Sequence, residues 1–126
     1  MSDIRVEFVP SFKGEAVVLL AMDVGGLAVF TAAVAQAIQT QQGSIEMVHA
    51  GVTHIFSLGH DTAEVDIQEN QIAWRFPPSK LIEILEKLEA MKKSPVPCHH
   101  YVDISIPAET LVLSRDEYVQ VVHAQL

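Results

Sequence analysis

The stretch from Ala16 to Ile38 reads AVVLLAMDVGGLAVFTAAVAQAI, and its pattern decides the fold that we predict. It contains 18 apolar residues and a single charged one, Asp23. Its first seven residues are continuously apolar, which is typical of a central strand that is covered on both faces. Asp23 can then cap a helix, because its carboxylate can accept hydrogen bonds from the exposed backbone amides of the first turn. The stretch therefore predicts a buried strand followed by a buried helix.

The predicted helix, residues 24–39, is apolar on nearly every side. One side carries a regular stripe that includes Leu27 and Phe30, and the opposite side carries Ala28, Val29, Ala32, Ala33 and Ala35. A helix of this kind is normally covered on more than one side. We expect a second helix on one side. On the other side we expect either a second copy of the chain, in a homodimer through helix 24–39, or the chain's own C-terminal segment.

Gly25 and Gly26 lie between the predicted strand and helix, where phosphate-binding loops occur in other proteins. The surrounding residues match neither of the glycine patterns of such loops. We therefore interpret the two glycines as allowing a close approach of the helix to the sheet.

The rest of the chain predicts several short strands and a second helix, residues 79–93, with apolar positions at helical spacing. Alternating or apolar strands are predicted at 4–8, 45–49, 53–58, 63–68, 72–76, 98–104 and 110–113. Ser114 and Glu117 have the spacing of a capping box, which predicts a short C-terminal helix from about Arg115.

These elements predict an α+β fold in a single domain, residues 1–126. We expect a mostly antiparallel sheet of about six to eight strands with two helices on one face. The order of two strands, a helix and two strands occurs twice. We therefore hypothesise two ββαββ halves, a pseudo-repeat of residues 1–59 and 60–114.

The composition limits the classes of partner. The 126 residues include 16 acidic and 8 basic ones, for a net charge of −8. An acidic chain is a poor candidate for nucleic-acid binding, which depends on basic residues. A negative field instead favours a basic protein partner.

The sequence also indicates a compartment. The first ten residues, MSDIRVEFVP, lack the pattern of a secretory signal, and Cys98 is the only cysteine. The apolar runs on either side of Asp23 are shorter than the ~20 residues that span a bilayer. We therefore expect a cytoplasmic protein without a membrane segment.

The densest cluster of reactive side chains is CHHYVD, residues 98–103. On a strand, His99, Tyr101 and Asp103 share one face, and Cys98, His100, Val102 and Ile104 share the other. We predict that His99, Tyr101 and Asp103 bind a partner. Glu83 and Glu86, on the second helix, form a separate acidic patch that is a further binding candidate.

A catalytic interpretation of the same cluster uses His99, His100 and Asp103, in a small metal-dependent or His/Asp hydrolase. His99 and Asp103 are about 13 Å apart on a strand, so a site needs a third group from elsewhere, such as His49, His54 or His60. The histidines do not show the spacing of a known zinc motif, so we predict no metal ligands and no cofactor.

Two further alternatives remain open. Cys98 is a nucleophile only if an imidazole lies within hydrogen-bond reach, and its neighbours in the sequence point away from it on a strand. A pocket between the sheet and the helices would instead make the protein a small-molecule-binding domain. An enzyme is the less favoured class.

The residues CHHYVD (98–103) and AETLVLSRDEY (108–118) resemble the C-terminal part of small uncharacterised bacterial proteins. Some of these are similar in size and charge to immunity proteins of bacterial toxin systems. The resemblance covers the last quarter of the chain. It implies a non-enzymatic protein that binds and blocks a partner, and it assigns no functional residues.

Overall fold

The computed structural model describes residues 2–40 and 43–117, and the α+β class is confirmed. Every strand and both helices that the sequence predicts within these residues are present. In chain order the elements are β1 (Ile4–Phe12), β2 (Glu15–Met22), α1 (Val24–Thr40), β3 (Ser44–His49), β4 (Val52–Leu58), β5 (Glu64–Ile67), β6 (Gln71–Phe76), α2 (Pro78–Lys93), β7 (Cys98–Asp103) and β8 (Thr110–Arg115).

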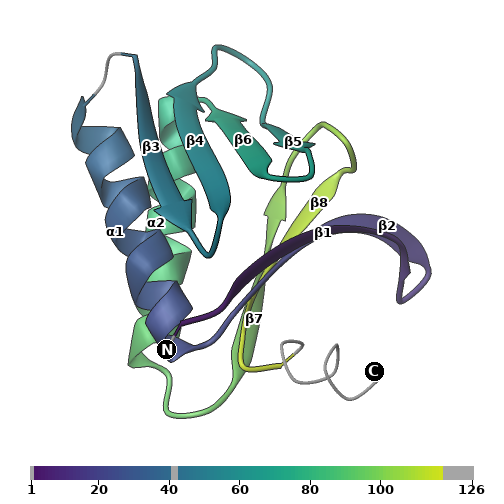
Figure 1. Ribbon diagram of the computed structural model, residues 1–126. Helices are drawn as coiled ribbons and strands as arrows, with labels where there is room; N and C mark the ends of the chain where they lie inside the picture. The colour runs from purple at the N-terminus through teal and green to yellow at the C-terminus, as the bar shows by residue number, and fades with distance from the viewer. Residues whose placement is uncertain (1, 41–42, 118–126) are drawn as a thin grey trace.

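The strands form two mixed sheets of four, so the prediction of one mostly antiparallel sheet is wrong. Sheet A has the order β1-β2-β8-β7, and sheet B has the order β3-β4-β6-β5 (Figure 1). The outer pairs of each sheet are antiparallel, and the central pair is parallel: β2 with β8, and β4 with β6. The sequence pattern shows the hairpins, but it does not show that consecutive hairpins enter different sheets.

The two sheets have equivalent topologies. If β1, β2, β3 and β4 of the first half are exchanged for β5, β6, β7 and β8 of the second, the strand order of sheet A becomes that of sheet B. The central registers also correspond, since Leu20 pairs with Leu113 and Trp74 pairs with Phe56. An internal duplication would produce this correspondence, and the duplication itself stays a hypothesis.

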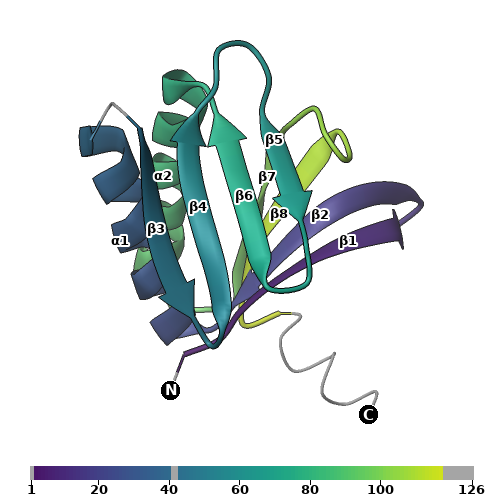
Figure 2. The same cartoon turned by 45° about the horizontal axis from the view of Figure 1, so that its top comes forward.

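The helices occupy equivalent places in the two halves. The four buried residues of α2 each lie 54 positions after a buried residue of α1: Leu81, Ile84, Leu88 and Met91 correspond to Leu27, Phe30, Val34 and Ala37. The two helices pack against each other, as predicted, and sheet B lies against them, with β3 and β4 next to α1 (Figure 2).

One apolar core joins the helices to the inner faces of both sheets. Phe30 of α1 contacts Phe56 and Trp74 edge-to-face, with ring centroids 5.4 Å and 5.1 Å apart. Leu20 and Leu113 bring sheet A into the same cluster. A second, smaller cluster lies on the outer face of sheet A and consists of Val17, Leu19, Ala21 and Val112. Both faces of β2 are therefore buried, as the sequence predicts for Ala16 to Met22.

The start of α1 confirms two predictions from the sequence. Asp23 caps the helix, since its Oδ1 accepts hydrogen bonds from the amides of Gly26 (2.7 Å) and Asp3 (2.9 Å). A Cβ on Gly26 would lie 1.8 Å from the carbonyl oxygen of Asp3. Only glycine allows this approach of α1 to the sheet.

The predicted C-terminal helix does not begin at Arg115, which is the last residue of β8. Ser114 also belongs to this strand and is fully buried, so it caps no helix. Asp116 and Glu117 are not helical, and the rest of the predicted helix, 118–126, lies outside the described residues. The parallel pairing of β8 with β2 extends the strand through Ser114 to Arg115.

Within residues 2–40 and 43–117, no helix has the length and apolar character needed to cross a membrane.

Arg115 connects the end of β8 to the C-terminus of α2. Its guanidinium is buried and donates hydrogen bonds to the carbonyls of Met91 (3.2 Å), Ser94 (2.9 Å) and Val96. These carbonyls belong to the last turn of α2 or to the residues that follow it, where no backbone amide of the helix is available as a donor.

We expect Arg115→Met to lower the free energy of unfolding by about 2–3 kcal/mol, because buried carbonyls lose their donors. Urea unfolding followed by circular dichroism measures this change. The matched control is Arg75→Met, at an exposed arginine on β6, which should change stability by about 0.5 kcal/mol or less. Equal losses in the two variants would contradict the role of Arg115.

His54 is a buried titratable group of the core, at 2% exposure. Trp74 Nε1 donates a hydrogen bond to its Nδ1 over 3.1 Å, so this nitrogen carries no proton. Burial, reinforced by the charge of His49, lowers the pKa of His54 to about 4.

We expect the folded state to lose stability as the pH falls from 6.5 towards 4. In this interval the unfolded chain binds a proton at His54 and the folded chain does not, at a cost of up to about 3 kcal/mol. The variant His54→Asn keeps an acceptor for Trp74 but cannot titrate, so its unfolding free energy should depend less on pH. His60→Asn, at an exposed histidine, should behave like the unmodified protein. A His54→Asn variant with an unchanged pH profile would refute this assignment.

Candidate functional site

The two faces of β7 have the composition that the sequence predicts. His99, Tyr101 and Asp103 pair with Ser114, Val112 and Thr110 of β8. Val112 belongs to the apolar cluster on the outer face of sheet A, so the three side chains share that outer face. Val102 belongs to the main core and Cys98 packs against it, which places the alternate residues on the inner face.

His99 is held in place by two neighbours. Its Nδ1 hydrogen-bonds to Glu117 Oε1 over 2.6 Å. Its ring also meets that of Tyr101 edge-to-face, with centroids 5.3 Å apart. Glu117 is therefore a site residue that the sequence reasoning assigned to a different role, in a capping box. The sequence gives little sign of this contact, because it depends on where the chain turns after β8.

Tyr101 is the most exposed aromatic side chain of the site, at 47%. It lies on an edge strand, since β7 pairs only with β8 in sheet A. Lys87 of α2 donates a hydrogen bond to the Tyr101 carbonyl over 2.7 Å, which fixes the strand against the helix. The side chain of Asp103 is also exposed and lies on the same face.

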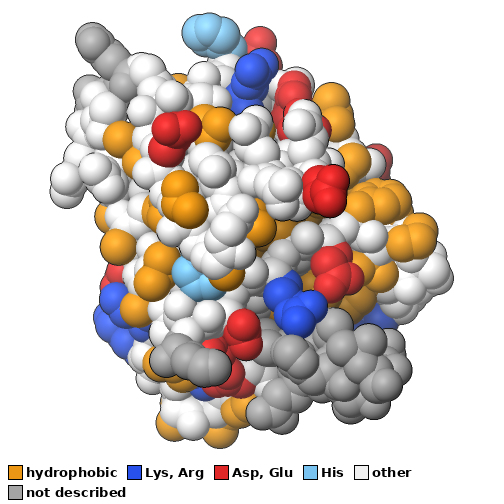
Figure 3. Space-filling view, viewed as in Figure 1, with side chains coloured by type: hydrophobic (Ala, Val, Ile, Leu, Met, Phe, Trp, Pro, Cys, Tyr) orange, Lys and Arg blue, Asp and Glu red, His pale blue; other side chains and the backbone are white. Residues whose placement is uncertain are grey.

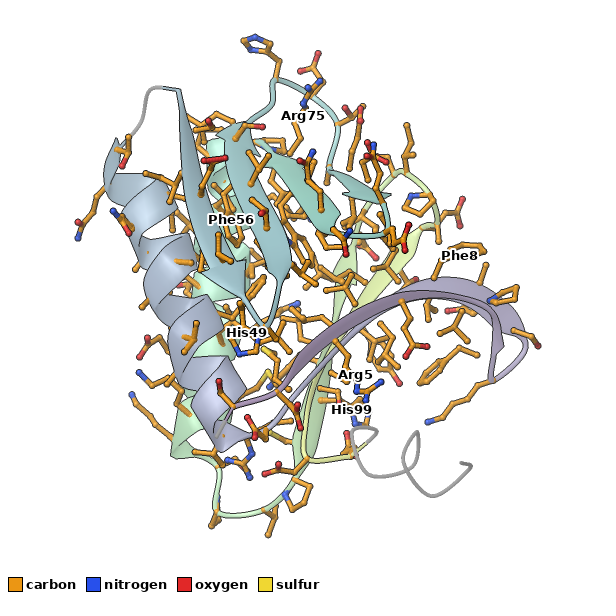
Figure 4. All side chains as sticks on the ribbon, in the orientation of Figure 1. Arg5, Phe8, His49, Phe56, Arg75 and His99 are labelled. Atoms are coloured by element: carbon orange, nitrogen blue, oxygen red, sulfur yellow. The ribbon has the colours of Figure 1, made fainter. Side chains whose placement is uncertain are left out.

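The residues that lie side by side with His99 across the four strands of sheet A form a row whose two end residues are polar. The registers place Arg5 beside Ala21, Ala21 beside Ser114, and Ser114 beside His99. Figure 4 shows Arg5 and His99 on this side of the molecule. The outer face thus has an apolar centre and polar margins.

The catalytic set His99, His100 and Asp103 does not come together on one face. His100 points to the inner side, where burial lowers its pKa and the charges of Lys87 and His99 add to this effect. Cys98 also lies on the inner side. In the part of the chain that the structure describes, no three histidine, cysteine or acidic side chains are grouped so that they could hold a metal ion.

The other three histidines that the structure describes occupy three different environments. His49, at the end of β3, has its Nε2 2.8 Å from Ser2 Oγ, and His54 is buried beside Trp74. His60 is exposed in the segment between β4 and β5. None of them provides the third group that the catalytic interpretation needs beside His99, among the residues described.

The two residues of the acidic patch differ in their surroundings. Glu83 accepts hydrogen bonds from Lys80 (3.0 Å) and Lys87 (3.1 Å). Burial opposes the ionisation of Glu83, but the two lysines prevail and lower the pKa of its carboxyl group. Its charge is therefore largely balanced, whereas Glu86 is exposed on the same helix.

The central space between the helices and the sheets is filled by side chains. Phe30, Trp74, Leu81 and Leu113 line this interior, which leaves no room for a water molecule. This central interior, as the described residues form it, therefore offers no small-molecule site. A separate cavity of about 310 Å³ lies between the two helices and the end of β4, lined by Ile38, Leu58, Pro78 and Ile82.

Comparisons of the chain with known proteins give no match, whether with protein-family models, with curated proteins or with solved structures.

Proposed function

We propose that this protein is a non-enzymatic protein-binding module, of the immunity or inhibitor type that its C-terminal quarter resembles. The outer face of β7 is its partner-binding surface. The supporting observation is the exposure of Tyr101 on a fixed edge strand, between His99 and Asp103. A rigid, half-exposed tyrosine is the kind of side chain that carries much of the energy in protein interfaces.

In this proposal the partner is a basic protein. The net charge of −8 attracts such a partner, and Asp103 and Glu86 supply exposed carboxylates. The low cysteine content and the bacterial resemblance support a location in a bacterial cytoplasm.

A hydrolase is the less favoured candidate. His100 and His99 lie on opposite faces of β7, so the two imidazoles cannot act on one substrate. Metal analysis of the purified protein tests the metal-dependent version, which requires a stoichiometric metal ion.

A photo-crosslinking amino acid at position 101 tests the binding surface in cells that naturally express the protein. We expect a discrete crosslinked protein, which mass spectrometry identifies and which is then purified. The matched control carries the same photo-crosslinker at position 82, because Ile82 is also a half-exposed apolar residue, on α2. Tyr101→Ala should weaken binding of the identified partner by about tenfold or more, because truncating an aromatic anchor costs about 1.4 kcal/mol or more. Equal crosslinking at both positions, or unchanged affinity, would refute the assignment.

We also propose that the protein forms a homodimer through helix 24–39, which corresponds to α1. This helix contains no charged residue, and Val24 and Val29 remain 62% and 37% exposed. Ala28 and Ala32 lie on the same exposed side, so two helices could approach closely there.

Light scattering coupled to size-exclusion chromatography tests the homodimer. We expect the mass of a dimer for the unmodified protein and of a monomer for Ala32→Glu, which buries a charge in the interface. The control Gln71→Glu introduces the same charge at an exposed residue of β6, outside the helix, and should remain dimeric. A monomeric mass for the unmodified protein at high concentration would exclude the homodimer.

A further inference from the structure

A groove of about 370 Å³ separates the free edges of the two sheets. The strand β1 ends sheet A on this side, and β5 ends sheet B. The lining comes from these two strands and from the segment between β7 and β8: Phe8, Glu64, Val65, Asp66, Ile67, Ile106 and Pro107.

The walls of this groove expose two large apolar side chains. Phe8 of β1 is 45% exposed, and Ile106, on the opposite wall, is 51% exposed. Single exposed apolar residues are common on protein surfaces, but two that face one groove favour an interaction site. Figure 4 places Phe8 on the side of β1 that is nearest to β5.

The edge of β5 already accepts an added segment of the chain. The amide of Val65 donates to the Ile106 carbonyl (2.9 Å), and the amide of Ser105 donates to the Ala63 carbonyl (2.8 Å). This short parallel bridge covers only the first part of β5. The groove therefore continues past Pro107 along Ile67.

The edge of β1 offers backbone groups to the same groove. Asp23 donates its amide to the Asp3 carbonyl over 3.3 Å, which makes this a hydrogen-bonded pair of the antiparallel ladder. Hydrogen-bonded and non-bonded pairs alternate along such a ladder. The N–H and C=O groups of Val6 and Phe8, which belong to non-bonded pairs with Leu20 and Val18, therefore point away from β2.

The charges around the groove have one sign. Glu64 and Asp66 belong to its lining, and none of the lining residues is basic. The Glu64 carboxylate accepts a hydrogen bond from the Thr62 hydroxyl over 3.1 Å, and Glu64 pairs with Arg75 of β6 in the ladder, whereas Asp66 pairs with Ala73. Figure 3 shows acidic side chains beside hydrophobic ones at the right of the molecule.

We propose that this groove binds an extended, basic peptide segment of a partner protein. The segment adds as a strand to the edge of β1 at Val6 and Phe8, as occurs in other proteins that recognise peptides through a sheet edge. Alternate residues of a strand point to opposite sides. Apolar side chains of the peptide therefore enter the space between Phe8 and Ile106, and the intervening lysines or arginines face Glu64 and Asp66. This site is separate from the outer face of β7.

A fluorescein-labelled nonapeptide of alternating lysine and valine is the probe, and fluorescence anisotropy measures its binding. The control peptide has the same charge but carries proline at its two central valine positions, so it lacks the amides that a strand needs. We expect the control peptide to bind at least about tenfold more weakly than the probe. Binding of the probe should itself weaken at higher salt. Equal binding of the two peptides would overturn the proposal, because charge alone would then explain it.

Two serine variants locate the site on the protein. Phe8→Ser should weaken binding of the lysine–valine probe by about tenfold, because it removes the apolar wall of the groove. The matched control is Val96→Ser, at an apolar residue that is 58% exposed elsewhere, and it should leave the affinity unchanged. Equal effects of the two variants would overturn the proposal.

Amide chemical shifts of the unmodified protein provide a measurement that does not depend on a variant. On addition of the lysine–valine probe, the largest changes should occur at Val6, Phe8 and Ile67, and changes confined to β7 would overturn the proposal. Tyr101→Ala should bind the probe normally. The proposal for the groove and the proposal for the β7 surface can therefore be refuted independently of each other.

Discussion

The parallel pairing of β2 with β8, and of β4 with β6, is the interaction on which the rest of the structure depends. Each half of the chain places one hairpin in sheet A and the other in sheet B, so neither half can complete a sheet alone. The pairing also brings the inner faces of both sheets onto the two helices. Leu20 and Leu113 of sheet A and Trp74 and Phe56 of sheet B then enclose a single core. The separation of hydrophobic groups from water thus stabilises both halves together.

Local patterns predict the elements well, because the chemistry that forms them lies within a few residues. The apolar run of β2, the Asp23 cap and the glycine at position 26 each have the expected role. The strand order is not local. Whether β2 pairs with β8 or with another strand depends on residues far apart in the sequence, whose apolar faces look alike. The helix predicted from about Arg115 does not begin there for the same reason, since pairing with β2 extends β8 to Arg115.

The candidate site shows the same limit. The period of two places His99, Tyr101 and Asp103 on one face, and it separates His100 from them. Glu117 reaches His99 only because β8 lies beside β7, and Lys87 reaches the Tyr101 carbonyl only because α2 packs on that strand. The groove between β1 and β5 has no signal in the sequence at all. It exists because the edges of two separate sheets approach each other.

The two halves differ in the exposure of corresponding positions. The central strands keep related outer positions, since Thr53 to Ser57 reads THIFS and Thr110 to Ser114 reads TLVLS. Their partners differ: the outer face of β2 is apolar and buried, whereas β6 has exposed polar residues at its two ends. A symmetric core does not require this difference between β2 and β6. The difference therefore reflects what surrounds each sheet on its outer face. The two proposed partner surfaces each involve an edge of sheet A, β7 or β1, and β5 of sheet B also lines the groove beside β1. In these proposals the edges of the sheets carry the binding surfaces, and the core that both halves share holds those edges in place.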